Sequence, residues 1–216
     1  MTKQQIAPYV DHTLLKPAKE KDIALLCQQA KEFGFASVCI LPDYVKFAKK
    51  QLENSSVKVC TVIGFPLGEN TTATKVYETK NAIKCGAEEI DMVINPSWAK
   101  ANQWKKVEKE ICAIKKACGD VLLKVIIESC LLSDKQIEKA CVASVNAKAE
   151  FVKTSTGFST GGATVNAVSI MAKTVHPHGL KVKASGGIRS YDDAVAMIEA
   201  GADRLGTSAG VAICKE

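Results

Sequence analysis

Short apolar runs alternate along this chain with longer segments whose apolar residues recur at helical spacing. Each run is rich in β-branched residues and nearly continuous in hydrophobicity, which is typical of a parallel strand covered on both faces. We therefore predict eight strands, over residues 9–14, 36–41, 57–64, 89–95, 121–128, 150–155, 180–185 and 203–207.

The segments between the runs predict helices. The segment from Lys19 to Phe33 places Ile23, Leu26 and Ala30 on one face. Residues 133–147 begin with Ser133 and Asp134, a cap residue followed by an acid. Further helices are predicted over 72–85, where Val76, Thr79 and Ile83 share a face, and over 97–117, 162–175 and 191–200.

Eight strands alternating with helices fit either a doubly wound open sheet or a closed barrel. No G-x-G-x-x-G follows the first strand, so the nucleotide-binding signature of the open fold is missing. Eight is also the strand number of the closed barrel. Because no low-complexity segment or Pro/Gly/Ser linker divides the sequence, we predict an α/β protein that is one compact (β/α)8 TIM barrel, a single domain over residues 1–216.

Composition narrows the class of partner. The chain has 216 residues, 47% of them hydrophobic and 24% charged, as in an ordinary globular protein. Its net charge of +6 would suit an anionic partner. However, only Arg189 and Arg204 are arginines, whereas nucleic-acid recognition favours arginine forks and clustered basic stripes. We expect no nucleic-acid partner and a solvated, mildly basic surface.

The cysteines and the first residues indicate a compartment. Nine cysteines form no C-x-x-C pair and no spacing typical of a disulfide framework. The segment Met1-Thr2-Lys3-Gln4-Gln5 lacks an apolar signal core, and no run of about 18 apolar residues occurs. We therefore expect a reduced, cytoplasmic protein without a membrane partner.

Four successive predicted strands carry charged residues in apolar surroundings. These are Asp91, Lys124, Lys153 and Lys183. Because side chains alternate along a strand, each can point into a barrel while its apolar neighbours face the helices. Neighbouring strands lie about 4.8 Å apart, so the four side chains should form one cluster.

Three lysines and one aspartate in a shared pocket cannot all keep ordinary pKa values. Desolvation and like-charge repulsion favour a neutral amine, so we expect at least one lysine to titrate well below about 10. A neutral lysine amine attacks carbonyl carbon and forms a Schiff base. The alternative is a structural ion-pair network, but one Lys–Asp pair would suffice for that role. The excess of lysines therefore favours catalysis.

Glycine-rich segments after the last two strands suggest a second subsite. Ser185-Gly186-Gly187 follows one strand, and Gly206-Thr207-Ser208 follows the other and leads into a short last helix near Ala209. Exposed backbone N–H groups there suit a phosphate dianion, in the usual phosphate position of such barrels. The alternative is that the glycines only serve turns with positive φ.

Several segments together resemble the deoxyribose-phosphate aldolase family, in an order and spacing that cover almost the whole chain. They are Asp11-His12-Thr13-Leu14-Leu15, Glu89-Ile90-Asp91-Met92-Val93-Ile94-Asn95, Leu123-Lys124-Val125-Ile126-Ile127-Glu128, Phe151-Val152-Lys153-Thr154-Ser155-Thr156-Gly157 and Lys183-Ala184-Ser185-Gly186-Gly187-Ile188-Arg189. The resemblance implies a class I aldolase without metal or other cofactor. Such an enzyme reversibly cleaves 2-deoxy-D-ribose 5-phosphate to acetaldehyde and D-glyceraldehyde 3-phosphate, in deoxyribose catabolism. Dimers are common in the family, which by analogy implies a homodimer.

The resemblance also implies roles for individual residues. Lys153 matches the Schiff-base lysine, and Lys183 matches a cationic lysine that depresses the pKa of the first. Asp91 matches the acid that transfers protons, and Lys124 matches a further lysine of the proton network. The matching substrate-binding residues are Asp11, Thr13 and Leu15 on the first strand, with Gly157, Gly186, Gly187, Gly206 and Ser208 at the phosphate. Phe158 stands where some members carry a lysine, which removes one phosphate-binding charge.

Other functions remain open from the residues alone. Another Schiff-base barrel, such as a transaldolase-like enzyme, would use the same lysines on a different substrate. A non-catalytic barrel that binds sugar phosphates would keep the phosphate site but would not form an imine. Competition between substrates distinguishes the first alternative from a deoxyribose-phosphate aldolase, and reductive trapping of an imine distinguishes the second.

Overall fold

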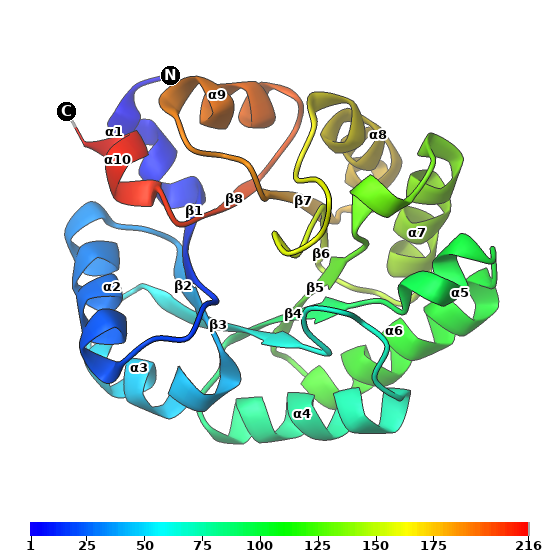
Figure 1. Ribbon diagram of the computed structural model, residues 1–216, viewed down its shortest axis with the longest axis horizontal. Helices are drawn as coiled ribbons and strands as arrows, with labels where there is room; N and C mark the ends of the chain where they lie inside the picture. Colours follow the sequence, from blue (N-terminus) through cyan, green and yellow to red (C-terminus); the bar gives the residue numbers. More distant parts are fainter. Residues whose placement is uncertain (216) are drawn as a thin grey trace.

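The computed structural model describes residues 1–215 and contains a closed barrel of eight parallel strands in chain order. Figure 1 looks along the barrel, with the strands at the centre and the helices around them. The predicted α/β barrel is therefore confirmed. The strands are β1 (Val10–Leu14), β2 (Ser37–Ile40), β3 (Lys58–Ile63), β4 (Glu89–Val93), β5 (Leu122–Ile126), β6 (Phe151–Lys153), β7 (Lys181–Ser185) and β8 (Arg204–Thr207).

Alternate side chains of each strand point to opposite sides, either toward the helices or into the barrel. Outward residues such as Met92, Val125 and Val182 are fully buried in the large apolar core between strands and helices. A second, smaller apolar cluster contains Leu15 and Val62. Each strand is β-branched-rich because both of its faces are covered, as parallel sheets require.

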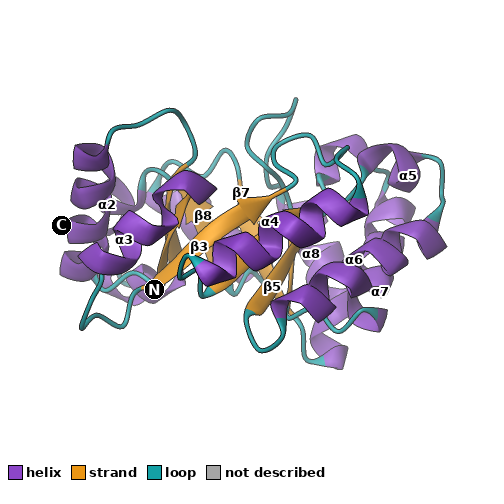
Figure 2. Ribbon diagram, turned by 90° about the horizontal axis from the view of Figure 1, so that it is seen from below, coloured by secondary structure: helices purple, strands orange, loops and turns teal. Residues whose placement is uncertain are grey.

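The helices form an outer layer, seen from the side in Figure 2. The chain ends meet at one side of this layer, where the first and last helices lie side by side (Figure 1). The helices are α1 (Lys3–Ile6), α2 (Glu20–Phe33), α3 (Val45–Gln51), α4 (Thr72–Lys84), α5 (Pro96–Lys100), α6 (Trp104–Cys118), α7 (Asp134–Asn146), α8 (Val165–Val175), α9 (Tyr191–Glu199) and α10 (Gly210–Cys214).

The structure corrects the helix prediction in three places. The segment predicted as one helix over 97–117 is two helices, because Asn102 adopts a φ of 56° between α5 and α6. The short helices α1 and α3 were not predicted, since each spans too few residues to show a helical period. In α4 the buried residues are Lys75, Thr79 and Ala82, so a lysine occupies a buried position that the sequence did not reveal.

Within residues 1–215 no helix is both long and apolar enough to cross a membrane.

Candidate active site

The four charged strand residues meet inside the barrel, as predicted. Strand pairing sets Asp91 of β4 beside Lys124 of β5, and Lys153 of β6 beside Lys183 of β7. Asp91, Lys124 and Lys183 are fully buried, and Lys153 is nearly so. The alternation of the strands therefore gathers three ammonium groups around one carboxylate.

Asp91 is the common partner of the three lysines. Its Oδ2 atom accepts hydrogen bonds from Lys153 Nζ and Lys183 Nζ, each over 2.8 Å. Its Oδ1 atom accepts one from Lys124 Nζ, also over 2.8 Å. Each of the three ammonium groups thus donates one hydrogen bond to the same carboxyl group.

The cluster holds more acids than the single aspartate expected from the sequence. Asp11 Oδ2 lies 2.5 Å from Lys183 Nζ, and Glu89 Oε2 lies 2.6 Å from Lys124 Nζ. Arg204 pairs with Asp11 and also with Glu89, whose Oε1 is 3.1 Å from its Nη2. Four cations therefore face three carboxylates, and the expected large excess of positive charge was wrong. Glu89 lies on the same strand face as Asp91, two residues away, which was the missed signal.

These carboxylates change the expected protonation of two lysines. Burial alone would lower the pKa of Lys183, but the charges of Asp11 and Asp91 outweigh it and raise that pKa. The pKa of Lys124 is likewise raised, because Asp91, Glu89 and Asp11 outweigh its burial. Burial of Asp91 is outweighed by the three lysines, which hold its pKa well below the usual range. Lys124 and Lys183 therefore keep their protons at neutral pH, and Asp91 is ionised.

Lys153 differs from the other two lysines in its access to solvent. Its side chain is 3% exposed, whereas those of Lys124 and Lys183 are 0% exposed. Of the three, it alone lines a pocket of about 520 Å³. It also contacts one carboxylate, Asp91, while the other two lysines each lie beside at least two. Lys153 is therefore the amine that a small molecule in the pocket would meet.

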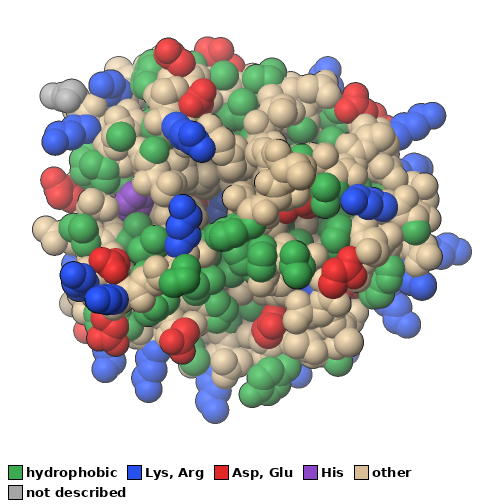
Figure 3. Space-filling view, in the orientation of Figure 1, with side chains coloured by type: hydrophobic (Ala, Val, Ile, Leu, Met, Phe, Trp, Pro, Cys, Tyr) green, Lys and Arg blue, Asp and Glu red, His purple; other side chains and the backbone are tan. Residues whose placement is uncertain are grey.

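The pocket is formed by the carboxyl ends of four strands and the segments that follow them, where the active sites of such barrels lie. The loop after β6 reaches toward the centre of the ring in Figure 1. In the space-filling view, Lys and Arg side chains lie beside a hollow near the centre of this face, with apolar side chains next to it (Figure 3). The pocket includes Thr13 near the end of β1 and Leu15 just after it, Gly157 after β6, Gly186 and Gly187 after β7, and Gly206 and Ser208 at β8.

The glycines of the pocket are explained by the backbone. Gly157, Gly186 and Gly187 all have φ between 82° and 85°, a region that disfavours other residues. Gly206 is needed for a different reason, because a Cβ there would lie 2.8 Å from Ser185 Cβ and 3.0 Å from Lys183 Cε. The glycines thus serve turns with positive φ, as the alternative interpretation held. The same turns also leave backbone atoms without side-chain cover at the pocket wall.

Other residues of the pocket differ from the sequence expectation. Asp11 does not line the pocket but lies fully buried in the ion-pair cluster, where Ser37 Oγ also donates to its Oδ1 over 2.7 Å. Lys16 and Arg189 line the pocket and add two cations that sequence reasoning did not single out. Phe158 lines it as well and packs edge-on against Phe65, with ring centroids 5.3 Å apart.

Glu128 holds the start of the loop after β6 through hydrogen bonds. Its backbone is left-handed, with a φ of 51°, and its side chain is buried. The carboxylate accepts hydrogen bonds from the backbone N–H and the hydroxyl group of Thr156. Because Gly157 and Phe158 follow Thr156 directly, this contact sets where the loop enters the pocket.

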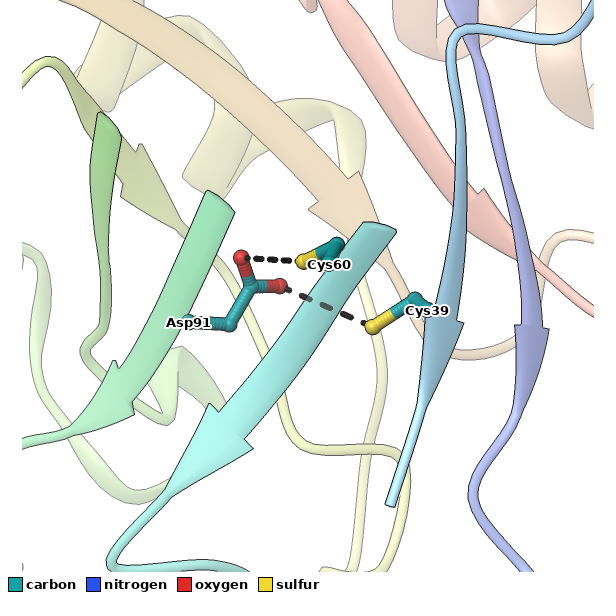
Figure 4. A group of neighbouring side chains, drawn as sticks. All are labelled: Cys39, Cys60 and Asp91. Atoms are coloured by element: carbon teal, nitrogen blue, oxygen red, sulfur yellow. Dashed lines mark hydrogen bonds between the residues drawn. The ribbon is translucent and has the colours of Figure 1, made fainter. Parts of the chain in front are cut away.

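Two cysteines complete the surroundings of Asp91 (Figure 4). Cys60 Sγ donates to Asp91 Oδ1 over 3.1 Å, and Cys39 Sγ lies 4.0 Å from Asp91 Oδ2. Among the described residues, these three side chains are the group whose ligand-type atoms lie close enough to hold one metal ion. Both oxygens of Asp91 already accept hydrogen bonds from ammonium groups, so a cation there would compete with the lysines.

Taken together, these contacts suit carbonyl chemistry at Lys153. A lysine amine is the nucleophile for a Schiff base, and an ionised carboxylate within hydrogen-bond reach can carry its proton. Two further ammonium groups keep that carboxylate ionised. The cations and bare backbone at the pocket mouth suit an anionic group on the same molecule.

Comparison with known families points in the same direction. The model of the DeoC/LacD family aldolases matches residues 6–216. A deoxyribose-phosphate aldolase of Streptococcus sanguinis is 57% identical over 208 residues, which cover 96% of this chain and 94% of the relative. Deoxyribose-phosphate aldolase 1 of Vibrio vulnificus is 58% identical over 206 residues, covering 95% and 94%.

Solved structures agree in fold over nearly the full chain. A crystal structure of a putative deoxyribose-phosphate aldolase from Coccidioides immitis superposes with a TM-score of 0.97 at 44% identity, covering 99% of this chain and 86% of the other. The tetrameric deoxyribose phosphate aldolase from Aeropyrum pernix gives a TM-score of 0.92 at 37% identity, covering 99% and 91%.

Proposed function

This chain belongs to the DeoC/LacD family of aldolases, and on that premise we propose that it is a deoxyribose-phosphate aldolase. It reversibly cleaves 2-deoxy-D-ribose 5-phosphate to acetaldehyde and D-glyceraldehyde 3-phosphate through a lysine Schiff base. The observation that carries the mechanism is that Lys153 opens to the pocket while sharing Asp91 with two fully buried lysines.

Lys153 is the nucleophile. Its Nζ gives up a proton toward Asp91 Oδ2, 2.8 Å away, and then attacks the aldehyde carbon of the open-chain sugar. The carbinolamine that forms loses water and becomes a protonated imine. Lys124 and Lys183 cannot take this role in the structure as it stands, since neither reaches the pocket.

The protonated imine then draws electrons from the bond to be broken. A base removes the proton from the C3 hydroxyl group, and the C2–C3 bonding pair moves toward the imine. Glyceraldehyde 3-phosphate leaves, and a neutral enamine stays on Lys153. Protonation of the enamine carbon and addition of water release acetaldehyde and restore the amine.

Asp91 and its buried partners move and balance these protons. Asp91 accepts protons because the surrounding lysines keep it ionised. Lys183 stays cationic between Asp11 and Asp91, and Lys124 stays cationic between Glu89 and Asp91. Their positive charges favour the ionised form of Asp91, so this carboxyl group releases the proton it has accepted before the next step.

The phosphate group binds at the pocket mouth. Backbone N–H groups and one hydroxyl group can donate hydrogen bonds there, and no large side chain blocks them. They belong to Gly157, Gly186, Gly187, Gly206 and Ser208. Lys16 and Arg189 supply positive charge at the same pocket, where Phe158 supplies none. Thr13 and Leu15 bound the other side of the pocket, and Asp11 acts on the site only through Lys183.

The partners of this enzyme are then small molecules, namely a sugar phosphate and aldehydes. Residues 1–216 would form one aldolase domain, and a homodimer in the cytoplasm stays a prediction. The Aeropyrum pernix relative is tetrameric, which makes the subunit number a matter for measurement in solution.

Reductive trapping tests the function and its central residue together. The protein is incubated with 2-deoxy-D-ribose 5-phosphate, reduced with borohydride and digested with trypsin. We expect irreversible inactivation and one adduct on Lys153, which also blocks tryptic cleavage after that residue.

Two variants control the experiment. Lys153→Ala should lose both turnover and the adduct, while Lys173→Ala, which removes an exposed lysine of α8, should keep both. An adduct on Lys124 or Lys183, or normal turnover by Lys153→Ala, would refute the assignment. Phosphate-ester binding without any adduct would instead indicate a binding protein.

A further inference from the structure

Two cysteines inside the barrel have no part in the reaction described above. Cys39 of β2 and Cys60 of β3 are register partners on neighbouring parallel strands. Both are fully buried in the smaller interior cluster, next to Leu15 and Val62. Side chains at paired positions of neighbouring strands project to the same side.

The positions of the two cysteines suit a covalent link. Their sulfur atoms lie within 4.8 Å of each other. Neighbouring strands bring paired Cα atoms to roughly 4.8 Å, inside the range of about 4.4–6.8 Å found in disulfides. Figure 4 shows both side chains directed toward Asp91, from adjacent strands.

The two thiols also differ in reactivity. The neighbouring Cys60 thiol, together with Lys183 and Lys153, outweighs burial and the Asp91 charge and lowers the pKa of Cys39 to about 7. Burial raises the pKa of Cys60 well above its ordinary value. The pair therefore combines a thiolate nucleophile with an adjacent thiol that can resolve it, as in redox-active cysteine pairs.

We propose that Cys39 and Cys60 are a modification site, at which a small neutral peroxide closes a reversible disulfide that inactivates the enzyme. The loss of activity rests on the proposed aldolase function, whereas the formation of the disulfide does not.

The reaction balances with hydrogen peroxide as the oxidant. The Cys39 thiolate attacks one peroxide oxygen, the O–O bond breaks, and a sulfenic acid and hydroxide form. The sulfur of Cys60 then attacks the Cys39 sulfur, its proton leaves with the hydroxyl group as water, and the S–S bond forms. Two electrons pass from the sulfurs to the peroxide.

The burial of the two sulfur atoms limits which oxidants can reach them. Both sulfurs are fully buried, and Leu15 belongs both to their cluster and to the lining of the pocket. Lys153 Nζ is 2.8 Å from the same Asp91 oxygen that lies 4.0 Å from Cys39 Sγ. Because the cluster adjoins the pocket, we expect hydrogen peroxide to reach the sulfurs from the substrate side and oxidised glutathione, which is far larger, to be excluded.

Closing the disulfide disturbs Asp91 in two ways. It removes the thiol proton that Cys60 donates to Asp91 Oδ1, and it alters the sulfur that accepts from Lys124 Nζ over 3.3 Å. It also removes the Cys39 thiolate, one of the anions beside Lys183. Since a positioned proton-transfer group contributes about 100- to 10,000-fold, we expect at least a roughly tenfold loss of kcat.

Peptide mapping tests the link directly. The full-length protein is treated with hydrogen peroxide or with oxidised glutathione, alkylated and digested with trypsin without reduction. Cleavage after Lys31, Lys46, Lys58 and Lys75 places Cys39 and Cys60 on separate peptides, 32–46 and 59–75, each with one cysteine. We expect peroxide to join these two peptides in step with the loss of activity, dithiothreitol to reverse both, and glutathione to do neither.

Matched variants separate this pair from the other cysteines. Cys60→Ser should leave peptide 32–46 unlinked, whereas Cys118→Ser, which removes a buried thiol outside the barrel, should leave the Cys39–Cys60 link intact. Two free peptides in peroxide-inactivated wild-type protein would overturn the inference, even if no variant folds. A link that forms without loss of turnover would overturn the inactivation, and failure of the reduced protein to cleave the sugar would count against the proposed function alone.

Discussion

At the scale of single residues, the barrel makes three lysines unequal. All three donate to Asp91, yet Lys124 and Lys183 are also held by Glu89 or Asp11. A cation between two carboxylates keeps its proton, whereas an amine with one carboxylate and an open side can exchange it. The proposed nucleophile, Lys153, thus differs from the cations Lys124 and Lys183 in its surroundings and not in its residue type.

Replacing Lys183 tests this division of roles. Lys183→Leu should lower kcat by about 100-fold or more, because Asp91 and Asp11 each lose a cationic partner. The matched control is Lys181→Leu, two residues earlier on β7 but exposed, which should keep its activity. Steady-state kinetics and circular dichroism of both variants decide the point. Full activity in a folded Lys183→Leu protein would remove this residue from the mechanism.

At the scale of elements, two local features shape the helical layer. The break between α5 and α6 occurs at Asn102, which adopts a left-handed φ and accepts a hydrogen bond from Gln136 Nε2 over 3.4 Å. Helices α4 and α6 are joined by a buried ion pair, in which Lys75 Nζ lies 2.8 Å from Glu110 Oε1. Hydrophobic periodicity reports neither feature, because both involve polar residues.

The break at Asn102 predicts opposite effects of two substitutions. Asn102→Gly should be nearly neutral, because glycine adopts positive φ without steric cost. Asn102→Val should lower the free energy of unfolding by about 1–2 kcal/mol, because a β-branched residue is strained there. Urea unfolding of the two variants measures the difference. Equal stability of both variants would show that the turn rearranges around the substitution.

The Lys75–Glu110 pair predicts non-additive stability. Lys75→Met should cost about 3–5 kcal/mol, because it leaves the Glu110 carboxylate buried without its partner. The double variant with Glu110→Leu should recover most of that loss, since both charges are then gone. Burial affects these two groups more strongly than their mutual attraction does. The pKa of Glu110 is therefore raised, and the pKa of Lys75 is lowered. A double-mutant cycle in urea measures the coupling, and simple additivity would contradict it.

At the scale of the whole molecule, barrel closure creates the charge cluster. Strand β1 pairs with β8, which brings Asp11 to Arg204 across a sequence separation of 193 residues. Asp11 then reaches Lys183 of β7, and Arg204 reaches Glu89 of β4 on the far side. The interior ion pairs therefore depend on every strand being in register.

This cluster predicts how stability depends on pH. The pKa values of Asp11 and Asp91 are lowered in the folded protein, because the lysine and arginine charges outweigh burial. Their stabilising contribution is present above about pH 4 and is lost progressively as pH falls below it. The raised pKa values of Lys124 and Lys183 contribute fully below about pH 10 and lose their effect only above it.

Urea midpoints across the pH range check this expectation. They should stay level between about pH 5 and pH 9 and fall below about pH 4. Chloride at matched ionic strength controls for screening of the surface charges, which contribute little to such buried pairs. A midpoint that is unchanged down to about pH 2.5 would contradict the ionised cluster.

The sequence by itself determined the eight strands, most of the outer helices and the inward-facing charges Asp91, Lys124, Lys153 and Lys183. These follow from local alternation, which repeats every two residues in a strand and needs no knowledge of neighbours. The tertiary structure alone decided that Asp11, Glu89 and Arg204 join the cluster, that Lys153 rather than Lys124 or Lys183 reaches the pocket, and that Cys39 lies beside Cys60. Those contacts depend on strand register and closure of the barrel, because they join residues that are far apart along the chain.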